Sequence, residues 1–174
     1  MSKDVRIAIS CPDRLGLLSA LAGRLFDLGA DMGGASFAIL GQTAEFTAVA
    51  RLPENLSADD IRIALEGVEE LGGAQIDVNA IAEDAPRADT GQVTHRVEIR
   101  GADQPGLVAR LTEAFADYEA NIVRMDCERV PAGAMGDYLI RIEAWIPESR
   151  AVTCLAAVDS TAQSLGLSSR AEPV

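Results

Sequence analysis

The segment that decides the fold is Cys11-Pro12-Asp13-Arg14-Leu15-Gly16-Leu17-Leu18. It returns 90 residues later as Gly101-Ala102-Asp103-Gln104-Pro105-Gly106-Leu107-Val108. Both copies keep an aspartate, a glycine three residues further on, and then a leucine. Repetition at a fixed offset indicates one structural unit that occurs twice. The chain of 174 residues is therefore expected to hold two similar small modules.

Apolar residues at helical spacing follow each copy of this segment. Leucines occupy positions 17, 18, 21, 25 and 28, and the matching positions hold Leu107, Val108, Leu111, Phe115 and Tyr118. Such spacing predicts an amphipathic helix. Ahead of each helix, apolar residues alternate over residues 5–9 and 95–99, which predicts a half-buried strand.

The rest of each half also repeats. A long alternating stretch, broken by small residues at 41–43 and at 131–136, predicts a hairpin. A second helix follows, with Ser57 as its N-cap and apolar residues at 61, 65, 68 and 71; its counterpart covers about 149–165. Glycines at 72–73 and 166 are expected to end these helices. Residues 74–80 predict a final strand, whereas 167–174 are short and polar and specify theirs weakly.

Each half thus predicts the order β-α-β-β-α-β. This order folds as a four-stranded antiparallel sheet with two helices on one face. The predicted fold class is α+β, with two ferredoxin-like modules. Residues 83–92 lack any periodicity and predict a linker, so we place the modules at 1–82 and 93–174.

The repeated Asp-x-x-Gly-Leu segment, with Asn121-Ile122 eighteen residues after Asp103, resembles the ACT domain, a family of small-molecule regulatory modules. The resemblance covers nearly the whole chain as two copies. Two copies with little else are similar to the glycine cleavage system transcriptional repressor family. The resemblance implies that a small amino acid of the glycine or serine class binds where the loop before the first helix of one module meets the second strand of another.

The same resemblance marks ligand-binding residues in both modules. In the second they are Asp103, Gly106, Leu107, Asn121 and Ile122, and in the first Asp13, Gly16, Leu17, Asp31 and Met32. The first module departs from the family pattern, because Leu15 replaces the usual proline and Asp31-Met32 replaces Asn-Ile. Two carboxylates at one site would repel a ligand carboxylate unless the ligand's ammonium lies between them.

The chemistry of these residues suits an amino acid, which carries an ammonium and a carboxylate. N–H groups at a helix start favour an anion, and glycine lets the backbone come close. Asp103 or Asp13 can accept from the ammonium, and Asn121 can bond either end of the ligand. In the simpler alternatives the aspartates only cap helices, Gly16 and Gly106 only serve tight turns, and Asn121 only marks a helix exit.

The composition argues against several functional classes. Twenty-seven acidic residues against 15 basic ones give a formal charge of −12, which opposes direct binding to nucleic acid or to anionic membranes. Four Phe, two Tyr and one Trp are few for an RNA-recognition sheet. One histidine and a single lysine, Lys3, leave no nucleophile with a base, and Asp13 with Asp31 is the one tempting carboxylate pair. We expect no enzyme.

Cysteine and histidine usage predicts neither a metal site nor a cofactor. Cys11, Cys127 and Cys154 form no CxxC pair, and only His95 could complete a metal shell. We expect free thiols in a reducing cytoplasm, with Cys127, Cys154 and His95 as packing residues. Cys11 precedes a helix start, where a thiolate would have a lowered pKa, although a passive role is the simpler interpretation. No signal peptide or membrane-length apolar run is visible.

Together these observations predict a cytoplasmic regulator. It would sense a small amino acid at an inter-module interface and act on transcription or metabolism through a protein partner, either a DNA-binding regulator or a metabolic enzyme. Open sheet edges predict side-by-side packing of modules and a homodimer. The main alternative is a ligand-free docking scaffold, and a less favoured one is an enzyme of the same fold.

Overall fold

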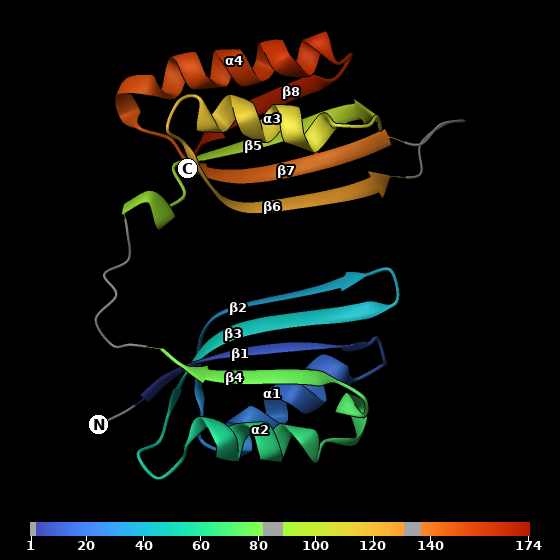
Figure 1. The fold of residues 1–174 in the computed structure, drawn as a ribbon, viewed down its shortest axis with the longest axis vertical. Helices are drawn as coiled ribbons and strands as arrows, with labels where there is room; N and C mark the ends of the chain where they lie inside the picture. The colour runs from blue at the N-terminus through green and yellow to red at the C-terminus, as the bar shows by residue number, and fades with distance from the viewer. Residues whose placement is uncertain (1–2, 82–88, 131–136) are drawn as a thin grey trace. The chain divides into compact units, whose positions relative to one another are not determined.

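The chain divides into two compact units of the same topology. The structure is a computed structural model that describes residues 3–81, 89–130 and 137–174. The units are Met1–Ala85 and Pro86–Val174, and each carries its helices on one face of its own sheet (Figure 1).

The first unit contains one four-stranded antiparallel sheet in the order β2-β3-β1-β4. Its elements are β1 (Lys3–Pro12), α1 (Leu17–Asp27), β2 (Asp31–Leu40), β3 (Thr43–Leu52), α2 (Ala58–Glu66), the 3-10 helix η1 (Glu69–Leu71) and β4 (Gln75–Ala80). The predicted turn at 41–43 joins β2 to β3.

The second unit repeats this sheet in the order β6-β7-β5-β8. Its elements are η2 (Asp89–Gly91), β5 (His95–Ala102), α3 (Leu107–Ala116), β6 (Asn121–Val130), β7 (Asp137–Trp145), η3 (Glu148–Arg150), α4 (Ala151–Ser164) and β8 (Ser168–Pro173). The predicted turn at 131–136 and residues 83–88 of the predicted linker lie outside the described residues. The α+β prediction with two ferredoxin-like modules is confirmed.

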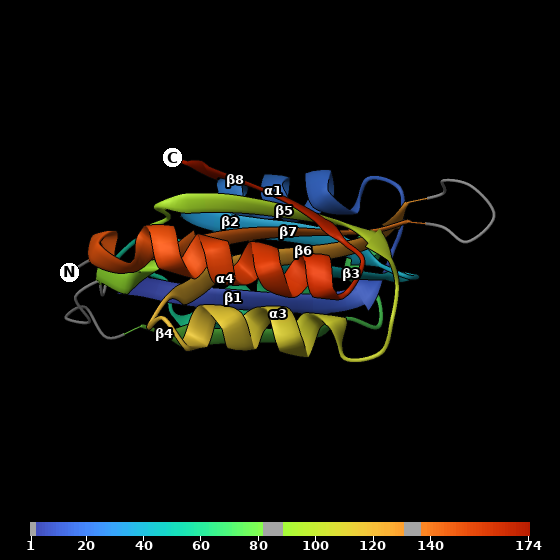
Figure 2. The same ribbon diagram turned by 90° about the horizontal axis from the view of Figure 1, so that it is seen from above.

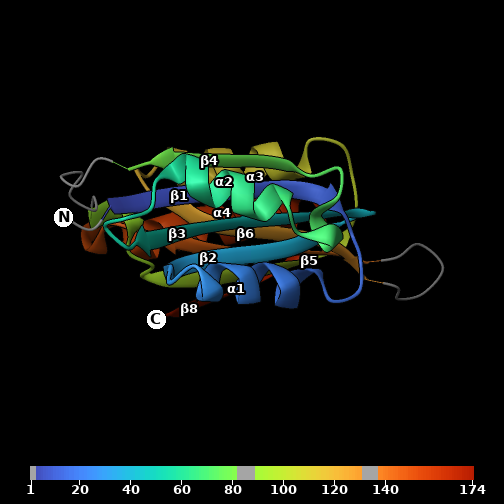
Figure 3. The same cartoon turned by 90° about the horizontal axis from the view of Figure 1, so that it is seen from below.

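Alternation along the central strands builds each core. Val5, Ile7 and Ile9 of β1 point to the helix side, where they pack with buried leucines of α1 and α2. Val97 and Ile99 do the same in β5, against α3 and α4. Figure 2 shows α3 and α4 over the second sheet, and Figure 3 shows α1 and α2 over the first. Apolar burial on one sheet face therefore holds each unit together.

The second helix of the first unit is shorter than predicted. Ser57 caps α2 as expected: its hydroxyl accepts from the Asp60 N–H at 3.2 Å, and its own N–H donates to Asp60 Oδ2 at 2.8 Å. The helix ends at Glu66, however, because Gly67 favours the helix weakly and Val68 is extended. The 3-10 turn η1 then returns Leu71 to the core.

The weakly specified last strand forms completely. β8 pairs with β5 from Arg100↔Ser168 to His95↔Pro173, just as β4 pairs with β1. Pairing with β5 supplies the backbone hydrogen bonds of β8, so β8 forms although its side chains are polar.

A difference in side-chain volume distinguishes the two modules at one core position. Cys11 in β1 corresponds to Gly101 in β5, and Ala74 before β4 corresponds to Leu167 before β8. A Cβ at Gly101 would lie 2.5 Å from Leu167 Cδ2 and 3.2 Å from its Cα. The larger residue thus comes from the first strand in one module and from the segment before the fourth strand in the other.

Candidate ligand-binding site

The loop after the first strand has the same backbone design in both modules. Gly16 and Gly106 stand at the helix starts with φ values of 83° and 80°, and no side chain caps either helix. This left-handed conformation favours glycine. Both glycines therefore serve tight turns, and the interpretation of Asp13 and Asp103 as N-caps is wrong. Leu17 and Leu107 donate their N–H groups to the Arg14 and Gln104 carbonyls at 3.2 and 3.3 Å. The next N–H groups of each first turn have no acceptor within their own helix, so these helix starts stay suited to an anion.

A side chain from the loop reaches the end of the second helical segment in both modules. Arg14 donates to the carbonyls of Glu69 and Gly72 at 3.2 and 3.1 Å. Gln104, at the matching position, donates to the carbonyl of Leu165 at 2.6 Å. Arg14 and Gln104 thus tie the loop to the end of the second helical segment of their own module.

The second module adds a polar cluster beside this loop. Arg129 Nη2, near the end of β6, donates to Asp103 Oδ2 at 2.6 Å. Tyr138 lies opposite Arg129 on β7 and packs with Cys127 at the edge of the core. Sequence reasoning missed Arg129 and Tyr138. The available signal was the alternation of Val123, Met125 and Cys127, which places Arg129 at the end of an otherwise apolar row.

Burial and hydrogen bonding determine the protonation of the Tyr138 phenol. Burial raises the pKa of Tyr138, and its hydrogen bond with Cys127 and the Asp103 carboxylate raise it further. The phenol therefore stays protonated at neutral pH and can donate. Burial also raises the pKa of Cys11, so the alternative of a low-pKa thiolate at that helix start is wrong.

The first module has no counterpart of the cluster. The pairing that places Arg129 opposite Tyr138 places Ile39 opposite Ala44, and Cys127 corresponds to Phe37. Ile39 is half exposed and Ala44 is buried. The first module thus has apolar side chains at the two strand positions that hold a guanidinium and a phenol in the second.

The remaining predicted residues lie at the opposite end of each sheet. Asp13 donates its backbone N–H to Gln42 beside the start of β3, whereas Asp31 pairs with Arg51 near its end. Eight residues of antiparallel strand span about 27 Å. Within one module, the carboxylate pair of Asp13 and Asp31 is therefore wrong.

Asn121 and Ile122 are separated from Asp103 in the same way along β7. Asn121 is the first residue of β6 and donates to the Thr90 carbonyl at 2.8 Å, whereas Glu119 takes the left-handed turn at the helix exit with φ 58°. The helix-exit interpretation of Asn121 is therefore wrong. Met32 is exposed, and Ile122 packs at the core edge. The loop residues and the strand-start residues can share a ligand only when two modules contribute to the site.

The predicted packing residues take the places expected of them. Cys154 is buried, and Cys127 is half-buried. His95 is half-buried, and its Nδ1 lies 2.9 Å from the Thr94 hydroxyl. All three cysteines are free thiols.

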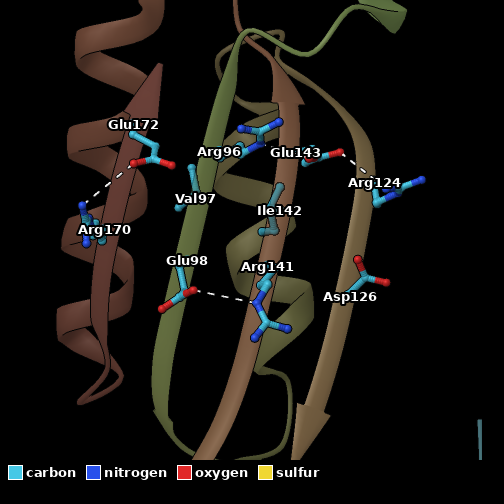
Figure 4. Close-up of a pocket in the computed structure, with 10 residues that line it drawn as sticks. All are labelled: Arg96, Val97, Glu98, Arg124, Asp126, Arg141, Ile142, Glu143, Arg170 and Glu172. Atoms are coloured by element: carbon cyan, nitrogen blue, oxygen red, sulfur yellow. Dashed lines mark hydrogen bonds and ion pairs between the residues drawn. The ribbon is translucent and has the colours of Figure 1, made fainter. Parts of the chain in front are cut away.

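The open face of the second sheet carries a shallow depression of about 420 Å³ (Figure 4). Its charged side chains alternate in sign along and across the strands; they are Arg96, Glu98, Arg124, Asp126, Arg141, Glu143, Arg170 and Glu172. Arg96 contacts Glu143 at 3.1 Å, and Arg141 contacts Glu98 at 3.8 Å. Because each charge faces an opposite one on the next strand, this face stabilises the sheet and favours neither anions nor cations.

Across the described residues, no group of three or more His, Cys, Asp or Glu side chains is placed to hold a metal ion. No helix among them is long and apolar enough to cross a membrane.

The comparisons with known proteins agree with this architecture. The family model described as ACT domain matches residues 95–144, from β5 through most of β7. An unknown protein from Galdieria sulphuraria has a TM-score of 0.82 and 20% sequence identity, covering 100% of this chain and 99% of that one. A protein described as a candidate glycine cleavage system transcriptional repressor has a TM-score of 0.67 and 12% identity, with coverage of 100% and 98%. None of the curated proteins matches the sequence.

These similarities define the class of the molecule. The second module matches the ACT domain model, and the first repeats its topology, so the chain is built from two ACT-like modules. At 20% identity and below, the full-length structural matches show the shared fold.

Proposed function

We propose that this chain is an amino-acid-sensing regulatory protein. It binds a small amino acid of the glycine or serine class at an inter-module site and passes the signal to a protein partner. The observation that carries this proposal is the repeated loop, in which an exposed aspartate precedes a helix start that no side chain caps. A carboxylate acceptor beside the backbone donors of a helix first turn suits a zwitterion.

The comparisons support the regulatory class, and neither full-length neighbour is described as an enzyme. The description of one neighbour as a candidate transcriptional repressor supports a role in transcription. With a net charge of −12, such a role requires a DNA-binding protein as the partner, because an acidic chain lacks the cations that displace counterions from DNA. A metabolic enzyme is the other class of partner.

A thermal-shift panel of the twenty amino acids tests the proposal. A ligand at one hundred times its Kd stabilises the folded state by about 2.7 kcal/mol, or roughly 5–10 °C at this chain length. Asp103→Ala is expected to abolish the shift. Asp126→Ala, which removes the same charge from the open face, is the matched control and should keep it. A wild-type panel without any shift would refute amino-acid sensing.

A second candidate function is a docking scaffold without a ligand. It is favoured by the contacts that already occupy two predicted ligand groups: Asp103 is paired with Arg129, and Asn121 donates to Thr90. A flat thermal-shift panel together with direct binding of a purified partner enzyme or regulator would support the scaffold.

We also propose a homodimer that uses the first module. Phe26 and Leu18 of helix α1 are 80% and 42% exposed, and Leu15, in the loop before the helix, is 101% exposed. Burial of such apolar side chains favours association. Light scattering at tens of micromolar should give twice the chain mass for the wild type and the single mass for Phe26→Asp. A monomeric wild type would contradict this.

A further inference from the structure

We propose that only the second module takes the ligand's carboxylate, through Arg129 and Tyr138, and that the ligand opens the Asp103–Arg129 ion pair. This inference rests on the proposed function. It names the residues that bind the ligand's carboxylate, and it sets the number of sites at one for each chain.

The ion pair presents the charges that a free amino acid needs. Arg129 Nη2 and Asp103 Oδ2 are 2.6 Å apart at the entrance to α3. A zwitterion inserted between them places its ammonium on Asp103 and its carboxylate on Arg129. The bond seen here uses one of the five guanidinium donors, so the guanidinium fork remains suited to bidentate binding of a carboxylate.

Both partners are accessible to a ligand. The Arg129 side chain is 80% exposed, and that of Asp103 is 38% exposed. An ion pair at this exposure contributes little to folding stability, because water solvates both charges. Its opening therefore costs little, and two new charge-assisted bonds replace one.

Tyr138 can supply a second donor when its hydroxyl exchanges Cys127, its hydrogen-bond partner in this structure, for the ligand. It lies directly opposite Arg129 in the β6–β7 pairing, with its ring at the edge of the core. Its hydroxyl remains protonated at neutral pH, since burial raises the pKa of the phenol. A carboxylate on Arg129 can thus accept a further hydrogen bond from the same sheet edge.

The first module serves as a built-in comparison. It has the aspartate and the left-handed glycine, but Ile39 and Ala44 stand where Arg129 and Tyr138 would be. Neither side chain can donate to a carboxylate. The first module therefore lacks both side-chain donors for the ligand's carboxylate although its loop is intact.

The test compares glycine and serine with their amides, glycinamide and serinamide, by calorimetric titration of the full chain. We expect one site per chain and at least tenfold weaker binding of the amino acid by Arg129→Gln. Tyr138→Phe should weaken it severalfold. Arg170→Gln, which removes an equally exposed arginine from β8, is the matched control and should bind as the wild type does. Unchanged Trp145 fluorescence verifies that each variant is folded.

The amides show whether Arg129→Gln removes recognition of the ligand's carboxylate or disrupts the whole binding site. They lack the carboxylate, so Arg129→Gln should leave their weak binding unchanged. Wild-type affinity for the amino acid in Arg129→Gln, or two sites per chain, would overturn the inference while the proposed function stands. If none of the twenty amino acids binds, both fail.

Discussion

The volume difference between the modules allows a quantitative test of core packing. Leu167→Ala removes a side chain that is 5% exposed and is expected to cost about 2–4 kcal/mol. Gly101→Cys alone introduces a Cβ 2.5 Å from Leu167 Cδ2, and such overpacking costs about 1–3 kcal/mol. Combining the two reproduces the Cys11 and Ala74 arrangement of the first module.

The double variant should be more stable than the sum of the two single costs predicts. The cysteine fills the space that Leu167→Ala leaves, and the alanine removes the clash at Gly101. We expect a total loss of about 1–2 kcal/mol, which is a favourable coupling of at least about 1 kcal/mol between the two sites.

Urea unfolding followed by Trp145 fluorescence measures this coupling. Trp145 is the single tryptophan and lies in β7, so the signal reports the second module. Gly91→Cys is the control, because a Cβ at Gly91 meets nothing within 4 Å. It should change stability by less than about 0.5 kcal/mol. If the two single costs add within about 0.5 kcal/mol, the packing argument is refuted.

Three further predictions concern the capping box, the thiols and the loop contact. Hydrogen bonds from Ser57 lower the pKa of Asp60 in the folded state. The Asp60 charge therefore stabilises the fold fully above the unfolded pKa of 3.8, and this contribution is lost as the pH falls through the lower folded pKa. Asp60→Asn should therefore destabilise at pH 7, and circular-dichroism melts should show this effect vanish once the pH is below the folded pKa. An effect independent of pH would contradict the capping box. Thiol labelling at pH 8 should modify half-buried Cys127 before buried Cys11, and mass spectrometry showing the opposite order would disprove the burial argument. Gln104→Ala should cost about 1–2 kcal/mol by removing the bond to the helix end, and unchanged urea unfolding at Trp145 would show that the contact is dispensable.

The fold was predictable because its signals are local and occur twice. The two copies of the Asp-x-x-Gly-Leu segment set the frame, and alternation or helical spacing on either side identifies each element. The prediction failed where local preference and tertiary packing disagree. Apolar residues at 68 and 71 continue the helical spacing of α2, but Gly67 ends the helix, and η1 brings Leu71 to the core by another backbone path.

The candidate site was only partly predictable. Asp103, Gly106 and Leu107 are neighbours in sequence, so their shared loop follows from the chain itself. Arg129 is 26 residues from Asp103, and the register of β6 on β7 places it beside Tyr138. Sequence spacing alone does not state that register.

The sequence by itself determined the repeated βαββαβ order, the apolar faces and the glycines at the starts of α1 and α3, because propensity, periodicity and left-handed backbone are properties of short segments. Only the tertiary structure decided which polar groups meet. Strand pairing sets Asp13 and Asp31 at opposite ends of one sheet and joins Arg129 to Asp103. These outcomes depend on register and strand length, which arise when distant segments pack on a common core.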